Sequence, residues 1–265
     1  MNLEFRSDRT GKYFINTKTG EEIREEVKSP MQIAFEKNLR FLNRETYEIE
    51  VFERFFQPNK EIKTLLVGES DFPTGEVVLA DPLAYLGTKY ETDLARKIRS
   101  GSYPVELSFY YSKIVGIRIA AARLVISNHE AVRYELAMPK GYTTKDIGKQ
   151  GVWSFFGVDM GLTCFSDLQV AEKYKEFIEQ WGEEHPKGNI YTDYFAEFFQ
   201  KSFEKYPDFQ KDSGSFLLWQ IPETEYRLIL FASGMGDGVY SGYWGLDTEG
   251  EVTCLVIPFI NPEYF

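Results

Sequence analysis

Cysteine and histidine, the residues that cross-link chains and ligate zinc, are scarce in this sequence. Cysteine occurs twice in 265 residues, at Cys164 and Cys254, which excludes a disulfide scaffold. Histidine also occurs twice, at His129 and His185, and the two cysteines lie far apart with no histidine nearby, so no zinc-binding spacing is present. We therefore expect no metal and no other cofactor.

Long apolar runs are missing as well. No stretch approaches the roughly 18 uninterrupted apolar residues of a membrane-spanning helix, and the longest runs, such as residues 255–260, have the length of a strand. The first residues lack the apolar core of a signal peptide. We therefore expect a cytoplasmic protein with no membrane partner, in which both cysteines are reduced.

Positive charge is depleted in the last part of the chain. Residues 151–265 hold 19 acidic and 7 basic side chains, a net of −12, whereas residues 1–60 are neutral overall and residues 61–150 carry +1. A field of this sign repels phosphate backbones, so we expect no nucleic-acid partner. The same field attracts a basic protein surface and speeds its association. An acidic composition that serves only solubility is the alternative.

Apolar residues are plentiful, at 43% of the chain, and aromatic residues reach 16%, which is ample for a packed core. Two amphipathic helices are predicted at residues 167–181 and 193–206, and strands are predicted on both sides of them. Strands in runs with helices clustered between them favour an α+β fold, in which antiparallel sheets pack against the helix pair. The first helix places one stripe of residues on its core-facing side: Val170, Tyr174, Phe177 and Trp181.

Residues 1–60 are predicted to form a peripheral N-terminal segment, and residues 61–265 a single α+β domain. The segment should contain a hairpin over residues 12–23, a helix opened by Ser29-Pro30, and a strand in which Tyr47, Ile49 and Val51 alternate with glutamates. Within the domain, residues 92–99 are predicted to be a short helix that ends before a glycine.

Residues 233–247 form the most unusual segment, because five glycines within twelve positions lie beside aspartates and aromatic residues. Glycine allows close backbone approach, and exposed tyrosine and tryptophan are common binding anchors. The spacing matches neither a phosphate-binding loop nor a calcium loop. The alternative is a glycine-kinked hairpin whose aromatics complete the core. The candidate ligand- or partner-binding residues of this segment are Asp237, Tyr240, Tyr243, Trp244 and Asp247.

Two further candidate residues are aspartates at predicted strand ends. Asp159 lies between apolar residues and near glycines, which is typical of a buried or cleft-facing carboxylate. Asp81 precedes a proline and also fits a turn. If these two aspartates converged with Asp237, the three carboxylates could bind a divalent cation for hydrolysis. The sequence leaves their convergence open.

Several motifs in this order resemble a bacterial family described as domain of unknown function 4241, over about residues 60–260. The resemblance implies no established activity and therefore no catalytic roles, and it marks the same aspartates and aromatic residues as places to look. The motifs are Val77-Val78-Leu79-Ala80-Asp81-Pro82, Gly101-Ser102-Tyr103-Pro104-Val105, Gly157-Val158-Asp159-Met160-Gly161, Gly236-Asp237-Gly238-Val239-Tyr240 and Tyr243-Trp244-Gly245-Leu246-Asp247.

The leading hypothesis is a non-catalytic binding protein that holds a basic protein partner on its acidic C-terminal surface. An immunity-type protein that neutralises a toxin is one concrete form. Two alternatives remain, a metal-dependent hydrolase that uses the cluster of aspartates and a small-molecule sensor with a Tyr/Trp-lined pocket. The shortage of nucleophile arrangements favours binding over catalysis.

Overall fold

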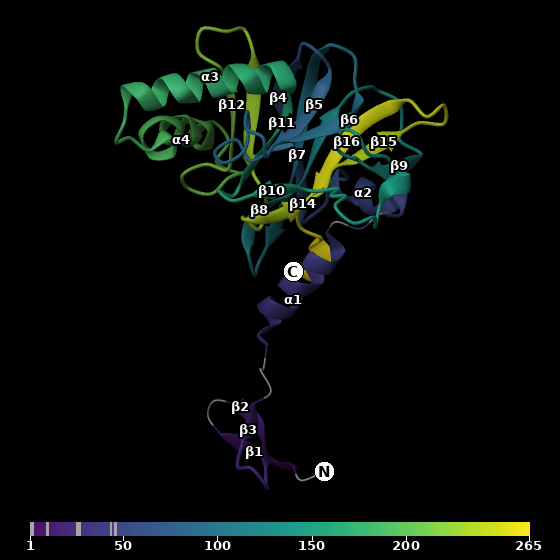
Figure 1. Ribbon diagram of the computed structural model, residues 1–265, viewed down its shortest axis with the longest axis vertical. Coiled ribbons are helices and arrows are strands. Elements are labelled where there is room, and N and C mark those ends of the chain that lie inside the picture. The colour runs from purple at the N-terminus through teal and green to yellow at the C-terminus, as the bar shows by residue number, and fades with distance from the viewer. Residues whose placement is uncertain (1–2, 9–10, 25–27, 43, 45–46) are drawn as a thin grey trace.

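The computed structural model describes residues 3–8, 11–24, 28–42, 44 and 47–265. At the N-terminus, strands β1 (Leu3–Asp8), β2 (Gly11–Asn16) and β3 (Glu22–Arg24) form an antiparallel sheet. The expected hairpin is confirmed, because β2 pairs with β3 across a turn at residues 17–20. Figure 1 shows this small sheet apart from the rest of the chain.

Helix α1 (Pro30–Phe41) begins as the sequence predicts. Ser29 and Gln32 form a capping box, in which the Gln32 amide donates to Ser29 Oγ and the Ser29 amide donates to Gln32 Oε1. The buried Asn38 then ties the helix to the C-terminal segment, because its side chain donates to the carbonyl of Phe259 and accepts from the amide of Asn261, both at 2.8 Å. Helix α1 is thereby fixed to the main body.

Two predictions of secondary structure are wrong: one predicted strand is a helix, and one predicted helix is a strand. Residues expected to form a strand near Tyr47 are helix α2 (Ile49–Phe55), because Phe52 and Phe55, three positions apart, are the side chains that become buried. Residues expected to form a helix are strand β6 (Thr92–Lys97), which pairs with strand β5 (Glu76–Ala80) and buries Leu94. In both cases tertiary packing overrides the local pattern.

The body contains two large antiparallel sheets, which confirms the predicted α+β class. The five-stranded sheet has the order β12-β13-β11-β5-β6, and the six-stranded sheet has the order β4-β7-β8-β16-β15-β9. A two-stranded sheet pairs β10 with β14. The remaining strands are β4 (Ile62–Phe72), β7 (Gly101–Ser112), β8 (Gly116–Val125), β9 (Arg133–Leu136), β10 (Phe156–Val158), β11 (Leu162–Asp167), β12 (Phe216–Gln220), β13 (Arg227–Ala232), β14 (Gly238–Tyr240), β15 (Tyr243–Leu246) and β16 (Val252–Pro258).

Alternate side chains along a strand point to opposite faces of its sheet and therefore pack into different cores. In β5, Val77 and Leu79 belong to the core between the two sheets, while Val78 and Ala80 belong to a second core beneath the helices. That second core is covered by α3 (Leu168–Glu184) and α4 (Ala196–Lys205), joined through a π-helical turn at Tyr191–Phe195. Figure 1 shows both helices along one side of the body, and the predicted helix pair is confirmed.

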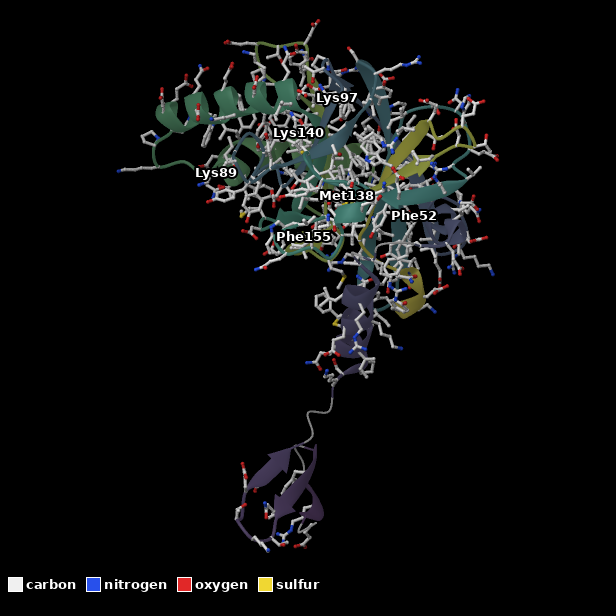
Figure 2. The ribbon with its side chains drawn as sticks, turned by 45° about the vertical axis from the view of Figure 1, so that its right-hand side comes forward. Phe52, Lys89, Lys97, Met138, Lys140 and Phe155 are labelled. Atoms are coloured by element: carbon white, nitrogen blue, oxygen red, sulfur yellow. The ribbon has the colours of Figure 1, made fainter. Side chains whose placement is uncertain are left out.

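The margins of the two sheets are tied together. On one side the amide of Ala95 in β6 donates to the carbonyl of Met138, just beyond β9. Glu76 of β5 pairs with Lys140, also beyond β9, at 3.6 Å, and with Lys97 of its own sheet at 2.7 Å. Figure 2 labels both lysines on the same side of the body. These links hold the edge of the five-stranded sheet against the edge of the six-stranded sheet.

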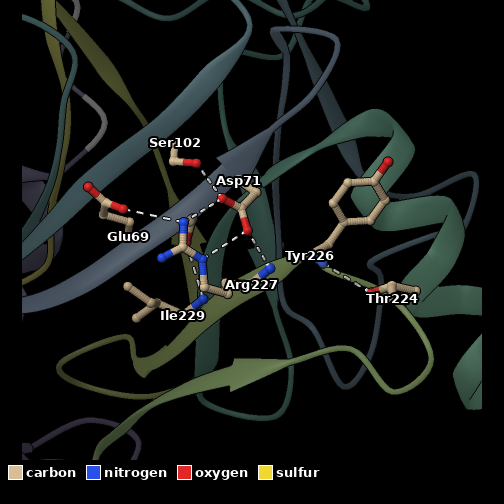
Figure 3. Close-up of polar contacts among 8 residues, drawn as sticks. Glu69, Asp71, Ser102, Thr224, Tyr226, Arg227 and Ile229 are labelled. Atoms are coloured by element: carbon tan, nitrogen blue, oxygen red, sulfur yellow. Dashed lines mark hydrogen bonds and ion pairs between the residues drawn. The ribbon is translucent and has the colours of Figure 1, made fainter.

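On the opposite margin an ionic network joins β13 to β4 (Figure 3). Arg227 contacts Asp71 through its backbone amide at 2.7 Å, through Nε at 3.1 Å and through Nη2 at 2.8 Å, and Nη2 also reaches Glu69 at 3.3 Å. Burial raises the pKa of Asp71, but hydrogen bonds from Arg227 and Ser102 outweigh it and hold that pKa below its usual value. The network therefore stabilises the ionised carboxylate.

None of the helices in the described part of the chain has the length and apolar character that crossing a bilayer requires.

Candidate functional site

Asp81 is fully buried and organises two turns. Its Oδ2 accepts from the amides of Asp159 at 3.1 Å and Met160 at 2.7 Å, and its Oδ1 accepts from the amide of Leu83 at 2.9 Å. Burial raises the pKa of this carboxyl, although the backbone hydrogen bonds oppose the shift. Asp81 thus uses both oxygens to hold neighbouring backbone.

Asp159 and Asp237 are both exposed and lie on neighbouring loops. Tyr85 donates its hydroxyl to Asp159, and a Cβ placed on Gly161 would lie 4.0 Å from Asp237 Oδ1. The fold therefore brings the loops of the three candidate aspartates together. The described residues nevertheless contain no group of three histidine, cysteine or acidic side chains that could hold a metal ion.

The aromatic residues of the glycine-rich segment lie in the core. Tyr240 and Trp244 are each 2% exposed and pack between the sheets, while Tyr243 is buried on the other face, against Phe52 of α2. Burial raises the pKa of Tyr240 to about 12. The aromatics thus complete the core, as the alternative expectation had it. The hairpin is only partly as expected, because β14 pairs with β10, and β15 forms a bulged hairpin with β16 whose register shifts between Gly245 and Leu246.

Asp247 closes the hairpin turn that follows. Its Oδ1 accepts from the amides of Glu249 at 3.0 Å and Glu251 at 2.9 Å, and its Oδ2 lies 2.9 Å from Nδ1 of His129. The contact with His129 holds the pKa of Asp247 below its usual value. Like Asp81, this carboxylate fixes local backbone, and neither residue presents a free carboxylate at the surface.

A different part of the acidic C-terminal region forms a groove. It has a volume of about 480 Å³ and lies between one face of α3, from Lys173 to Glu184, and the turn that joins β12 to β13. Half-buried aromatic side chains of Phe177, Trp181 and Tyr194 line it, and the rings of Phe177 and Tyr194 are 5.1 Å apart. We call it the α3 groove; its lining is Lys173, Glu176, Phe177, Gln180, Trp181, Glu184, Tyr194, Pro222, Glu223 and Thr224.

The position of Trp181 in the groove wall is fixed by its neighbours. His185 stacks on the indole with ring centroids 4.5 Å apart and an angle of 13° between the planes. A Cβ at Gly188 would lie only 2.7 Å from Cη2 of Trp181, so glycine is needed at that position for the ring to lie there. Because the ring is held on these sides, it presents a preformed aromatic surface to the groove.

Negative charge accumulates at the end of α3 that borders the groove. The last turn of the helix contains Glu183 and Glu184 and no basic residue. The carbonyl end of a helix already carries partial negative charge, so each carboxylate there is unfavourable by about 0.3–1 kcal/mol. Lys173 is the cation in the groove wall, and it pairs with Glu176 at 2.6 Å.

Glu223 enters the groove from a turn with an unfavourable backbone conformation. The amide of Thr224 donates to the carbonyl of Ile221 across Pro222 and Glu223, and Glu223 has φ of 60°. Positive φ at the third position of such a turn favours glycine or asparagine. A residue held in an uncommon conformation at the edge of a cavity suggests a functional constraint.

Sequence reasoning assigned Phe177 and Trp181 to the same stripe as Val170 and Tyr174, and therefore to the core. The structure buries Val170 and Tyr174, but the stripe extends past the sheet, so Phe177 and Trp181 remain half-exposed. The signal that could have separated them was the run of glutamates at the end of the helix, which marks a solvent-facing end.

These features define an α+β protein with an aromatic groove that carboxylates surround. A sequence profile for the family described as "Protein of unknown function (DUF4241)" matches residues 70–257, which includes the whole α3 groove. The chain belongs to this family, as the motifs predicted. No curated protein and no solved structure matches it.

Proposed function

We propose that this protein binds a basic protein partner, and that the α3 groove is the centre of the binding surface. The observation that carries the proposal is the composition of the groove. Three carboxylates, Glu176, Glu184 and Glu223, surround aromatic rings, and Lys173 is the one cation among the lining residues. Carboxylates and aromatic faces together attract cations, since both present negative potential.

The cost of this arrangement to the fold supports the proposal. Glutamates at the carbonyl end of α3 and the positive φ of Glu223 both disfavour the folded state. A cationic partner would relieve the electrostatic part of that cost on binding. A surface that served only solubility would need neither the strained turn nor the fixed position of Trp181.

The distribution of charge over the chain agrees with this function. The groove lies within residues 151–265, which carry the net charge of −12. Complementary charge raises the association rate and orients the encounter, and a buried aromatic anchor then slows dissociation. Neutralisation of a basic toxin by an immunity-type protein is one form of such binding, and Asp159 and Asp237 are further exposed carboxylates in this acidic part of the sequence.

The test is affinity capture from a lysate of the native organism at low and high salt. The wild-type chain is compared with Trp181→Ala and Glu223→Gln, and with Glu225→Gln as a control that removes an exposed carboxylate from the same turn region. We expect one basic protein, bound at 1:1 ratio, that is lost at high salt and in both groove variants. Equal capture by the groove variants would contradict the proposal, because the groove would then not be the contact.

A further inference from the structure

We propose that the α3 groove receives an arginine side chain of the basic partner and discriminates against lysine. This inference rests on the proposed function and names the chemical group that enters the groove. It follows from how the carboxylates and the aromatic rings are distributed over the groove walls.

The carboxylates offer acceptors from two walls at once. Glu184 comes from α3 and Glu223 from the turn between β12 and β13. Neither forms an ion pair with any side chain in the described part of the chain, whereas Glu176 already pairs with Lys173. A guanidinium carries five N–H donors in one plane and can serve carboxylates on two sides, but an ammonium is a compact point charge. Glu184 Oε1 accepts from Nε2 of Gln180 at 3.2 Å, but neither Glu184 nor Glu223 pairs with a cation among the described residues, and carboxylates without a cation on two walls favour arginine.

The aromatic lining favours arginine for a second reason. The rings of Phe177 and Tyr194 and the indole of Trp181 face the same groove, and tryptophan is the strongest cation–π acceptor. A guanidinium stacks flat on such rings and is weakly hydrated, whereas an ammonium is strongly hydrated and loses more on leaving water. His185 covers one face of the Trp181 indole, so the guanidinium would contact the part of the indole that lines the groove.

The dimensions of the groove agree with a whole side chain as occupant. Its volume of about 480 Å³ falls within the range of about 300–1,000 Å³ that is usual for ligand sites. The groove therefore has room for an extended arginine together with part of the neighbouring backbone. Charge complementarity, with three glutamates against one lysine in the walls, identifies the occupant as cationic.

The experiment compares hexa-arginine with hexalysine, which have equal length and charge, by titration calorimetry against the full chain at fixed ionic strength. We expect hexa-arginine to bind about tenfold more tightly than hexalysine. The preference should be lost in Trp181→Leu and reduced in Glu223→Gln, which changes no packed ring. Glu225→Gln should keep it. Circular dichroism checks that each variant is folded.

The outcomes separate the two proposals. If both peptides bind with equal, salt-dependent affinity, the arginine inference is overturned while the proposed function stands. If neither peptide binds even at low salt, both proposals are overturned. A preference for arginine that persists unchanged in the folded Trp181→Leu and Glu223→Gln variants would show that the discriminating site lies elsewhere, and it would overturn the inference.

Discussion

Replacing Glu223 should stabilise the protein and weaken its binding at the same time. Glu223 is exposed, holds φ of 60° and lines the α3 groove. Asparagine removes the charge and tolerates the left-handed conformation, whereas glycine removes the strain completely but adds freedom to the unfolded chain. Both substitutions therefore remove the same charge, but they differ in how much backbone strain they relieve and in how much they change the entropy of the unfolded chain.

The magnitude follows from the backbone. A non-glycine residue in the left-handed region costs roughly 1–2 kcal/mol, and asparagine recovers part of this through local hydrogen bonds. We expect Glu223→Asn to raise the free energy of unfolding by about 1 kcal/mol, which for a chain of this size raises Tm by about 2–4 °C. Glu223→Gly should gain about 0.5 kcal/mol, because the unfolded-state entropy offsets about 0.4–1 kcal/mol.

The assays are thermal unfolding and titration with hexa-arginine. Loss of one exposed carboxylate should weaken binding by about 0.2–1 kcal/mol, which is up to about fivefold. Glu225→Asn is the matched control, since Glu225 is exposed nearby and does not line the groove; its Tm should stay within about 1 °C of the wild type. The reasoning is refuted if Glu223→Asn lowers Tm, or if it leaves the affinity unchanged.

Three further variants test other parts of the structure. Asp71→Asn should lower the free energy of unfolding at pH 7 by about 1–3 kcal/mol, because it disrupts the contact with Arg227. Because the pKa of Asp71 is lowered, its contribution is present above the usual carboxyl pKa and is lost as the pH falls below it. In denaturant titrations the difference from wild type should therefore shrink in acid, and a difference that stays constant with pH would contradict this. Burial raises the pKa of Glu91 to about 7, so stability should fall as pH rises from about 4.5 to about 7. Glu91→Gln should reduce the change of Tm with pH, and it should be more stable than the wild type at pH 8. If the variant keeps the wild-type dependence of Tm on pH, Glu91 is not the group that causes it. Gly188→Ala should displace Trp181, change its fluorescence and weaken hexa-arginine binding, and an unchanged spectrum would show that the ring tolerates the methyl group.

Local sequence patterns predicted those elements whose structure depends on residues close together in the chain. The capping box at Ser29 and the two amphipathic helices are encoded within a few residues, and the structure forms them as expected. The failures at α2 and β6 arise where a distant partner decides. Residues 92–97 become a strand because β5 offers an edge, and no local pattern records that edge.

The candidate site was harder to predict for a related reason. Aspartates and aromatics near glycines can bind ligands or hold turns, and only the tertiary structure shows that Asp81 and Asp247 hold backbone amides while Tyr240 and Trp244 fill the core. The α3 groove depends on where a helix passes the edge of a sheet. The acidic C-terminal charge was readable from composition, but the position of Glu223 opposite α3 was not.

The most direct test of the account is site-specific photo-crosslinking in the native cell. A photoreactive benzoyl-phenylalanine is placed at Gln180, which lines the α3 groove, and in a second strain at Gln200, which is exposed on α4 outside the groove. The account predicts one crosslinked basic protein from position 180 and none from position 200, with the attachment beside an arginine in the partner. A partner captured equally from both positions, or only from position 200, would contradict the claim that the groove is the binding site.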